Sequence, residues 1–281
     1  MRKKTNRPFI AFQGERGAYS ELAARRLFSD SVQLLPCQTF ELVFQQVDSG
    51  EVDFGVIPIE NSLAGSIHQN YDLLLRYDLQ IVGELNQRIV HNLIANRKAT
   101  FSSIVRIFSH PQALMQCQRN LSRLKHVEIV PAYDTAGSVK KIKEEGIMDG
   151  AAIASELAAK IYGMKILKRR IQDNPENFTR FLVLSRKSPI PRGANKTSVV
   201  FSVKNIPGAL FRSLSVFALR DIDLYKIESR PLHGKPWEYL FYIDFAGNQT
   251  DKNCRNALQH LSEIATFWRV LGYYKRDEQR A

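Results

Sequence analysis

A hydroxyl and a guanidinium stand side by side in DNPENFTRF, residues 173–181. The stretch opens with turn formers and leads into the apolar run LVLSR, so Thr179 and Arg180 are expected where a loop becomes a strand. An arginine holds a carboxylate through two parallel hydrogen bonds. A threonine hydroxyl is a weak acid that serves a departing group needing only slight help. The pair, preceded by Asn177, is a candidate anion site; alternatively, Arg180 pairs with a surface acid and Thr179 caps the loop.

A second polar loop, QGERGAYSE, follows the predicted strand FIAFQ. Its two glycines permit a tight turn, and Ser20 is expected to be the N-cap of the helix SELAARRLF, where free backbone amides favour an anion. The spacing matches neither GxGxxG nor the Walker pattern, which disfavours nucleotide binding. A simple capped turn explains the stretch equally well.

A third loop, PIENSLAGSIHQN, follows the predicted strand VDFGVIPIE. It gathers the small polar side chains of Glu60, Asn61, Ser62 and Ser66 after a buried strand, an arrangement that suits the oxygens of a ligand. A polar turn that caps the next helix is the alternative.

The fourth loop is SHPQAL, in which Ser109 or His110 is expected to cap a helix begun by Pro111. His110 is a candidate general base, since imidazole titrates near neutral pH. A capping or buried hydrogen-bonding histidine is the alternative. No histidine spacing indicates a metal site.

The composition describes a globular chain of 281 residues with a net charge of +12 and three separated cysteines. The basic residues are scattered and often mixed with acids, and no nucleic-acid-binding motif appears, so we expect no nucleic-acid partner. The cysteines have neither metal-ligand nor redox spacing. No apolar run could span a membrane and no signal peptide is evident, so we expect a cytoplasmic protein without a membrane partner.

Strand-like and helix-like segments alternate over residues 8–186, in two similar sets. This pattern predicts an α/β domain of two lobes with a ligand cleft, one of whose helices would cover residues 110–124. Residues 187–196, KSPIPRGANK, are typical of a linker. Residues 197–275 follow the order β-α-β-β-α-β, which predicts a small ferredoxin-like domain that needs docking or dimerisation for stability.

Two stretches of this C-terminal domain are candidate ligand sites, NIPGALF (205–211) and IESRP (227–231). Asn205 and Gly208 flank a predicted helix start at Pro207, where free amides could hold the carboxylate of a small amphiphile. A tight strand-to-helix turn is the alternative.

Together and in this order, the motifs resemble those of the prephenate dehydratase family followed by an ACT regulatory domain. The resemblance rests on GxxGAYSE (14–21), PIENSLxGS (58–66), NYDLL (70–74), SHPQAL (109–114) and NxTRF (177–181), then PGAL and ESRP. Each motif alone is weak, but the set spans nearly the whole chain and shows no departure from the family pattern. No chorismate mutase segment precedes Phe9, so the chain resembles the monofunctional form.

The resemblance implies a fold like the two-lobed periplasmic binding proteins and loss of water and carbon dioxide from prephenate to give phenylpyruvate. Aromatisation drives this reaction, so no cofactor and no metal are expected. Thr179 would assist departure of the hydroxyl and Arg180 would bind a substrate carboxylate. Substrate-binding residues would be Tyr19, Ser20, Glu60, Asn61, Ser62, Ser66, Ser109, His110, Gln112, Asn177 and Phe181.

The ACT resemblance implies feedback by phenylalanine in a homodimer or homotetramer. The effector would bind at an interface between subunits. Its site would include Asn205, Pro207, Gly208, Ala209, Leu210, Glu228, Ser229 and Arg230. Two rivals remain: an arogenate dehydratase, which shares the motifs, and a non-catalytic amino-acid sensor, which the intact Thr179–Arg180 pair disfavours.

Overall fold

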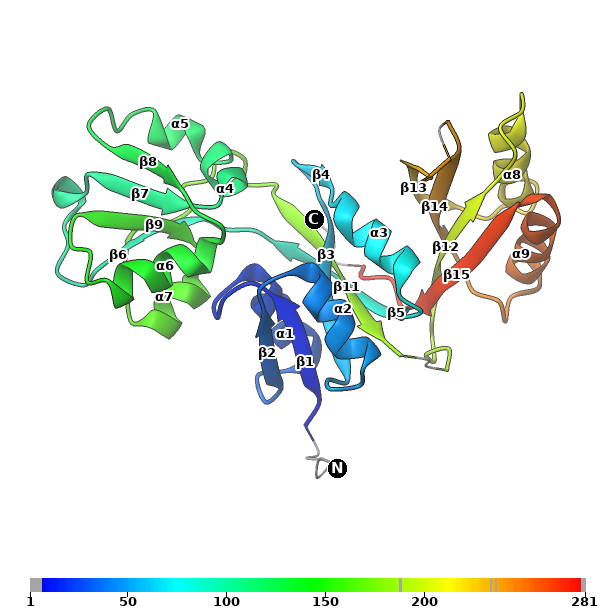
Figure 1. Ribbon diagram of the computed structural model, residues 1–281, viewed down its shortest axis with the longest axis horizontal. Coiled ribbons are helices and arrows are strands. Elements are labelled where there is room, and N and C mark those ends of the chain that lie inside the picture. The colour runs from blue at the N-terminus through cyan, green and yellow to red at the C-terminus, as the bar shows by residue number, and fades with distance from the viewer. Residues whose placement is uncertain (1–6, 187–188, 233, 236, 279–281) are drawn as a thin grey trace. The chain divides into compact units, whose positions relative to one another are not determined.

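The computed structural model describes residues 7–186, 189–232, 234–235 and 237–278 (Figure 1). Within these residues the chain forms two compact units, the first of 7–78 and 85–183 and the second of 79–84 and 184–278. Lys187 and Ser188, at the start of the predicted linker, lie outside the described residues.

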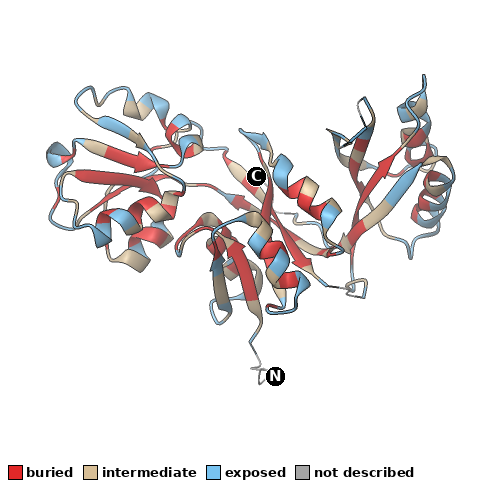
Figure 2. Cartoon of the chain, in the orientation of Figure 1, coloured by how far each residue is buried: buried red, intermediate tan, exposed pale blue. Residues whose placement is uncertain are grey.

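The first lobe is a mixed sheet whose central strands run parallel, with β1 pairing β2 on one side and β3 on the other. In spatial order its strands are β2 (Gln33–Cys37), β1 (Phe9–Gln13), β3 (Phe54–Asn61), β11 (Phe178–Ser185) and β5 (Gln80–Arg88), with the short β4 (Gly65–Ser66) beside β3. Its helices are α1 (Tyr19–Phe28), α2 (Phe40–Asp48) and α3 (His68–Arg76). The helices pack on strands that are almost wholly buried at the centre of the sheet (Figure 2).

The second lobe is another mixed sheet, sandwiched between helices. In spatial order its strands are β10 (Lys165–Lys168), β6 (Asn92–Ala95), β9 (Gly150–Ala154), β7 (Arg106–Ser109) and β8 (Glu128–Pro131). Its helices are η1 (Phe101–Ser103), α4 (Pro111–Met115), α5 (Gln118–Leu121), α6 (Thr135–Glu144) and α7 (Glu156–Tyr162). Along β9, Ala152 packs toward α6 and α7 whereas Ala151 and Ile153 pack toward α4. This alternation, the two-residue period of a strand, gives the sheet two buried faces.

The C-terminal domain is a four-stranded antiparallel sheet with two helices against it. Its elements, in chain order, are β12 (Lys196–Ser202), α8 (Ala209–Ala218), β13 (Leu224–Pro231), β14 (Tyr239–Ala246), α9 (Lys252–Ile264) and β15 (Phe267–Tyr274). The strands lie side by side as β13-β14-β12-β15. The predicted α/β class, with two lobes and a ferredoxin-like β-α-β-β-α-β domain, is confirmed.

Three local predictions are wrong. Ser20 does not cap α1: it lies inside the helix, and the buried carboxylate of Glu21 accepts a hydrogen bond from the Gly17 amide at 2.7 Å instead. The predicted helix over 110–124 is divided into α4 and α5. Helix α8 begins at Ala209, after Gly208, and not at Pro207.

The break between α4 and α5 has a tertiary cause. Asp173 donates its backbone amide to the Gln116 carbonyl at 2.8 Å, and its side chain accepts the Arg119 amide at 2.9 Å. Both groups would otherwise join a continuous helix, so the loop that carries Asp173 ends one helix and caps the next.

Candidate functional site

A cavity of about 480 Å³ lies between the two lobes, and we call it the catalytic cavity. Its volume falls in the range of small-molecule sites. Segments from both sheets form its walls. Its polar and aromatic lining includes Gln13, Tyr19, Ser20, Phe40, Asn61, Ser66, His91, His110, Gln112, Gln116, Tyr133, Asp134, Thr135, Thr179 and Phe181.

Thr179 reaches this cavity because it lies second in β11 and its side chain turns toward the lining, where it is 8% exposed. Arg180 is the next residue of the strand. Neighbouring residues of a strand point to opposite faces, and Arg180 is not among the residues that line the cavity. The geometry therefore brings Thr179 to the site but does not favour the predicted contact between Arg180 and a substrate carboxylate.

Two asparagines hold Thr179 in place. Asn61, the last residue of β3, donates its side-chain amide to the Thr179 hydroxyl at 3.0 Å. The same amide donates to the Asn177 side-chain oxygen at 2.7 Å. Asn177 is fully buried and does not line the cavity. It therefore acts on Thr179 indirectly, through the side chain of Asn61.

The side chains of His91, Gln116 and Tyr19 lie together at this site, and the sequence did not predict them as a group. His91 is 2% exposed, and its Nε2 lies 2.9 Å from the side-chain oxygen of Gln116, while its Nδ1 lies 2.9 Å from the Tyr19 hydroxyl. Burial lowers the pKa of His91, and the hydrogen bond with Gln116 acts in the opposite direction. The sequence signal for His91 was a polar pair, His91–Asn92, inside an otherwise apolar stretch.

Helix N-termini, rather than basic side chains, face this cavity. Ala18 to Ser20 at the start of α1, and Ser66 and Ile67 at the start of α3, are part of its lining. Within the described residues, neither helix has a side-chain cap at its N-cap position. The lining contains no lysine or arginine in the described part of the chain. The N-terminal ends of helices carry partial positive charge, so this wall suits an anion.

One carboxylate, Asp134, also lines the cavity. Its two oxygens accept hydrogen bonds from the amides of Ala136 and Glu15, each at 2.8 Å, so it caps α6 and fastens the 14–18 loop. Burial raises the pKa of Asp134, with the backbone amides opposing that shift.

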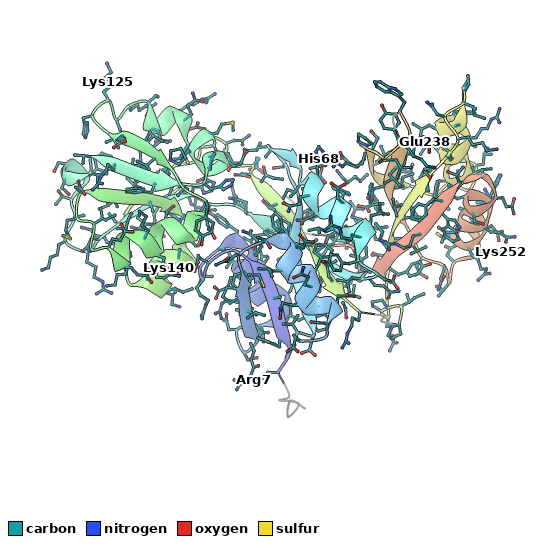
Figure 3. The ribbon with its side chains drawn as sticks, in the orientation of Figure 1. Arg7, His68, Lys125, Lys140, Glu238 and Lys252 are labelled. Atoms are coloured by element: carbon teal, nitrogen blue, oxygen red, sulfur yellow. The ribbon has the colours of Figure 1, made fainter. Side chains whose placement is uncertain are left out.

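The same loop receives two further contacts from the second lobe. The carboxylate of Glu15 accepts a hydrogen bond from the Tyr133 hydroxyl at 2.7 Å and pairs with Lys140 at 3.1 Å (Lys140 is labelled in Figure 3). Ser155 donates to the Gly17 carbonyl at 2.6 Å. The second lobe therefore contacts the 14–18 loop through four side chains, those of Tyr133, Asp134, Lys140 and Ser155.

The remaining predicted substrate residues divide into two groups. Tyr19, Ser20, Ser66, His110, Gln112 and Phe181 line the cavity; Glu60, Ser62 and Ser109 do not. Ser109 is fully buried and donates to the Ile153 carbonyl, and Ser62 pairs with the backbone of Phe178. His110 is the N-cap of α4, where its Nδ1 accepts the Gln112 amide at 3.2 Å, and burial lowers its pKa.

The C-terminal domain has a pocket of about 300 Å³, which we call the C-terminal pocket. It is lined by Val203, Lys204, Asn205, Ile206, Gly208, Ala209, Leu210, Phe211, Tyr239 and Phe241. Four predicted effector residues therefore meet there, namely Asn205, Gly208, Ala209 and Leu210. Glu228, Ser229 and Arg230 lie on β13 instead, and Pro207 is not part of the lining.

Among the described residues, no helix has both the length and the apolar character to span a bilayer. The same residues contain no group of three or more histidine, cysteine, aspartate or glutamate side chains arranged to hold a metal ion.

Comparison with known proteins agrees with this geometry. The family model described as prephenate dehydratase matches residues 10–189. Over 280 residues the chain is 50% identical to "Arogenate dehydratase/prephenate dehydratase 2, chloroplastic" of Arabidopsis thaliana, covering 95% of this chain and 73% of that protein. It is 48% identical to "Arogenate dehydratase 2" of Petunia hybrida, covering 99% and 74% of the two chains.

Two solved structures are similar over almost their whole length. Prephenate dehydratase from Arthrobacter aurescens, determined in complex with L-Phe, superimposes with a TM-score of 0.90 at 33% identity, covering 97% of this chain and 91% of that one. A protein described as "GqqA- a novel type of quorum quenching acylases" superimposes with a TM-score of 0.89 at 34% identity, covering 97% and 100%. From the family match and the identity to its relatives, this chain belongs to the prephenate dehydratase family.

Proposed function

We propose that this chain is a carbon–oxygen lyase that converts prephenate to phenylpyruvate, carbon dioxide and water. The observation that carries the proposal is that Thr179 of the NFTRF motif lines the cavity between the lobes. In the reaction the ring C–O bond breaks, and the leaving hydroxyl takes the Thr179 proton to become water. The electrons of the bond to the ring carboxylate enter the ring as carbon dioxide departs, and solvent returns one proton to Thr179, so one proton is consumed overall.

In this proposal the two carboxylates of prephenate bind at the N-termini of helices α1 and α3. Their amides are fixed in place by the fold, so no reorganisation is needed when charge moves during the reaction. Arg180 remains a predicted catalytic residue, but its place on the other face of β11 does not support direct contact with the substrate. The expectation that no cofactor is needed rests on the chemistry of aromatisation.

Arogenate is the second candidate substrate, and one observation favours it. Asp134 places a carboxylate in the cavity lining, and arogenate carries an ammonium where prephenate carries a keto group. The Petunia relative is itself named an arogenate dehydratase. Both substrates would use the same hydroxyl departure at Thr179.

Steady-state rates on the two purified substrates test this proposal. Phenylpyruvate formed from prephenate is followed by its ultraviolet absorbance, and phenylalanine formed from arogenate by chromatography. We expect turnover of prephenate. Because a similar structure is described as an acylase and a fold alone does not define a reaction, the absence of turnover on both substrates would overturn the proposal.

We also propose that phenylalanine regulates the enzyme through the C-terminal pocket. The N-terminal end of α8 carries partial positive charge and, within the described residues, has no side-chain cap at Gly208, which suits the carboxylate of an amino acid, and Leu210 and Phe241 give the pocket an apolar wall. Ile206 and Phe211 at its edge are 51% and 76% exposed, which suits burial against a second copy in a homodimer or homotetramer. In such an assembly Glu228, Ser229 and Arg230 would be supplied to the pocket by a neighbouring subunit.

The domain boundaries stay part of the proposal: a catalytic domain of 8–186, a linker of 187–196 and a regulatory domain of 197–275. The cytoplasmic location also remains a prediction, and the Arabidopsis relative is named as chloroplastic.

A further inference from the structure

The side-chain amide of Asn61 has one orientation that satisfies its neighbours. Its oxygen accepts hydrogen bonds from the backbone amides of Leu63 at 3.0 Å and Ala64 at 2.9 Å. A backbone N–H can only donate, so this end of the side chain must be the oxygen. The NH₂ group is therefore turned toward the Asn177 oxygen at 2.7 Å, the Thr179 hydroxyl at 3.0 Å and the Phe178 carbonyl at 3.0 Å, and these three acceptors share its two hydrogens.

This orientation decides the role of the Thr179 hydroxyl. The oxygen of Thr179 accepts a hydrogen bond from Asn61 at 3.0 Å. A hydroxyl has one hydrogen and two lone pairs, and the bond from Asn61 occupies a lone pair. Within the described residues, Asn61 is the only hydrogen-bond partner of this oxygen. The hydrogen is left to point into the catalytic cavity, toward a bound ligand.

The donor and acceptor of each hydrogen bond are also fixed for the residues that connect Asn61 to the second lobe. Asn61 donates to the Asn177 oxygen, so the Asn177 NH₂ group donates to the Gln116 oxygen at 2.8 Å. Because that oxygen accepts, the Nε2 of His91 must carry a hydrogen and donate to it at 2.9 Å. Gln116 is the C-cap of α4 and so belongs to the second lobe. The hydrogen bonds therefore run from Gln116 in the second lobe, through Asn177 and Asn61, to Thr179 in the first lobe.

We propose that Asn61 is a positioning residue that aims the Thr179 hydroxyl at the leaving group. Gln116 holds Asn61 in this orientation through Asn177 and through a direct hydrogen bond from the Gln116 side-chain amide to the Asn61 oxygen at 3.4 Å. The inference rests on the proposed dehydratase function. As the C–O bond breaks, the Thr179 proton passes to the leaving hydroxyl to form water. The hydrogen bond from Asn61 then strengthens to the nascent alkoxide, which regains a proton from solvent, so stabilisation is greatest when charge develops.

Asn61→Asp tests the proposal with almost no change of shape. The carboxylate still accepts from Leu63 and Ala64 but cannot donate to Thr179, whose hydrogen then turns toward it and away from the cavity. We expect kcat to fall about 10²-fold with KM changed less than about 3-fold. Asn120→Asp is the matched control, because Asn120 on α5 donates to the Ile171 carbonyl outside the cavity. Circular dichroism and thermal unfolding establish that each variant is folded.

A double-mutant cycle separates positioning from direct contact. If Asn61 acts through Thr179, Asn61→Asp should cost no further activity in a Thr179→Ala background. Losses that multiply, or a rise in KM at unchanged kcat, would overturn the inference and return Asn61 to the substrate-binding set. Wild-type protein inactive on both substrates would instead overturn the proposed function.

Gln116→Leu tests the same set of bonds from the second lobe, and it decides the matter if Asn61→Asp does not fold. Loss of the Gln116 oxygen frees Asn177 to turn, so we expect kcat to fall about 10-fold, again with little effect on KM. In the Thr179→Ala background this loss should also disappear. A Gln116→Leu enzyme with wild-type kcat would contradict the inference.

Discussion

The catalytic cavity and the C-terminal pocket differ in how completely a single chain builds them. In the catalytic cavity the key polar groups are buried and bonded to one another: Asn177 is fully buried, and Thr179 and His91 are less than a tenth exposed. In the C-terminal pocket the edge is formed by exposed apolar side chains, among them Ile206 and Phe211. Figure 2 shows the buried strands on which each site is built.

This difference follows from what each site must do. A catalytic site needs groups held in place before the substrate arrives, and buried hydrogen-bonded networks supply that rigidity. A regulatory site needs two states of similar free energy, which the C-terminal pocket would have if a second subunit completes it, as proposed above. Substitutions should therefore have large, localised effects in the first site and small effects on basal activity in the second.

The largest expected effect is that of Thr179→Ala. Removing a proton donor in the transition state should lower kcat about 10³-fold while KM changes little. Initial rates over a range of prephenate concentrations measure both constants. Thr179→Ser, which keeps the hydroxyl, is the control and should retain most of the activity. Near-wild-type turnover by Thr179→Ala would remove Thr179 from the mechanism.

Gly17→Ala should have the next largest effect, on stability. Gly17 has φ of +91°, and an added Cβ would lie 2.6 Å from the Cα of Ala158 in the second lobe. Both backbone strain and overlap with another backbone segment destabilise the fold, by about 3 kcal/mol together. Urea denaturation measures the free energy of unfolding.

Gly146→Ala is the matched control for Gly17→Ala. Gly146 also has a positive φ, of +62°, but an added Cβ there meets nothing within 4 Å. Gly146→Ala should lower the free energy of unfolding by about 1 kcal/mol, from backbone strain alone. Equal losses in the two variants would show that the second lobe yields to the added methyl group, and that the 14–18 loop is held less tightly than its contacts indicate.

The sequence predicts the regular elements of the catalytic domain well because their apolar periodicity is local information. It also places TRF correctly at the start of a strand, since turn formers precede an apolar run there. It does not predict that α4 ends at Met115, because that break depends on Asp173, a residue far away in the chain whose contact arises only on folding.

The candidate site shows the same division. Asn61 is the last residue of β3, where the rule that ligands bind outside the carboxyl ends of strands finds it. Thr179 lies at the start of β11, which that rule does not cover, and only its polar motif marked it. His91 and Gln116 lie in stretches without such a motif, and only the packing of two lobes brings their side chains together. The prediction for Arg180 rested on the carboxylate-binding chemistry of a guanidinium and on the family motif. Neighbouring residues of a strand point to opposite faces, which the motif does not reveal, so Arg180 stays a predicted carboxylate-binding residue that is not part of the cavity lining.

Gly208→Ala should have a smaller effect than Gly17→Ala on stability. Gly208 is the N-cap of α8 with φ of +78°, but an added Cβ finds its nearest neighbour, the Arg212 side chain, at 4.0 Å. Strain of about 1 kcal/mol should shift the start of α8 and weaken inhibition by phenylalanine several-fold, with basal kcat nearly unchanged. Inhibition curves for wild type and variant measure this. Undiminished inhibition would place the effector outside the C-terminal pocket.

The smallest expected effect concerns pH and the buried His91. Burial lowers its pKa below the ordinary value of 6.5, whereas in the unfolded chain the ring protonates at that ordinary value. Between the two values the unfolded state binds more protons, so the free energy of unfolding falls as the pH drops from about 6.5 through the folded pKa. His91→Gln should make this decline shallower by at most about 1.4 kcal/mol per pH unit.

Urea denaturation of wild type and His91→Gln between about pH 7.5 and pH 5 tests this. His126→Gln, in an exposed loop, controls for the loss of a histidine as such. His110 also has a pKa lowered by burial, so part of the acid sensitivity should persist in the variant. If the slope of His91→Gln equals that of wild type, His91 does not stay neutral in the fold. A charged ring would then donate from Nδ1 to Tyr19 as well as from Nε2 to Gln116, and the catalytic cavity would hold a buried cation in place of a neutral network.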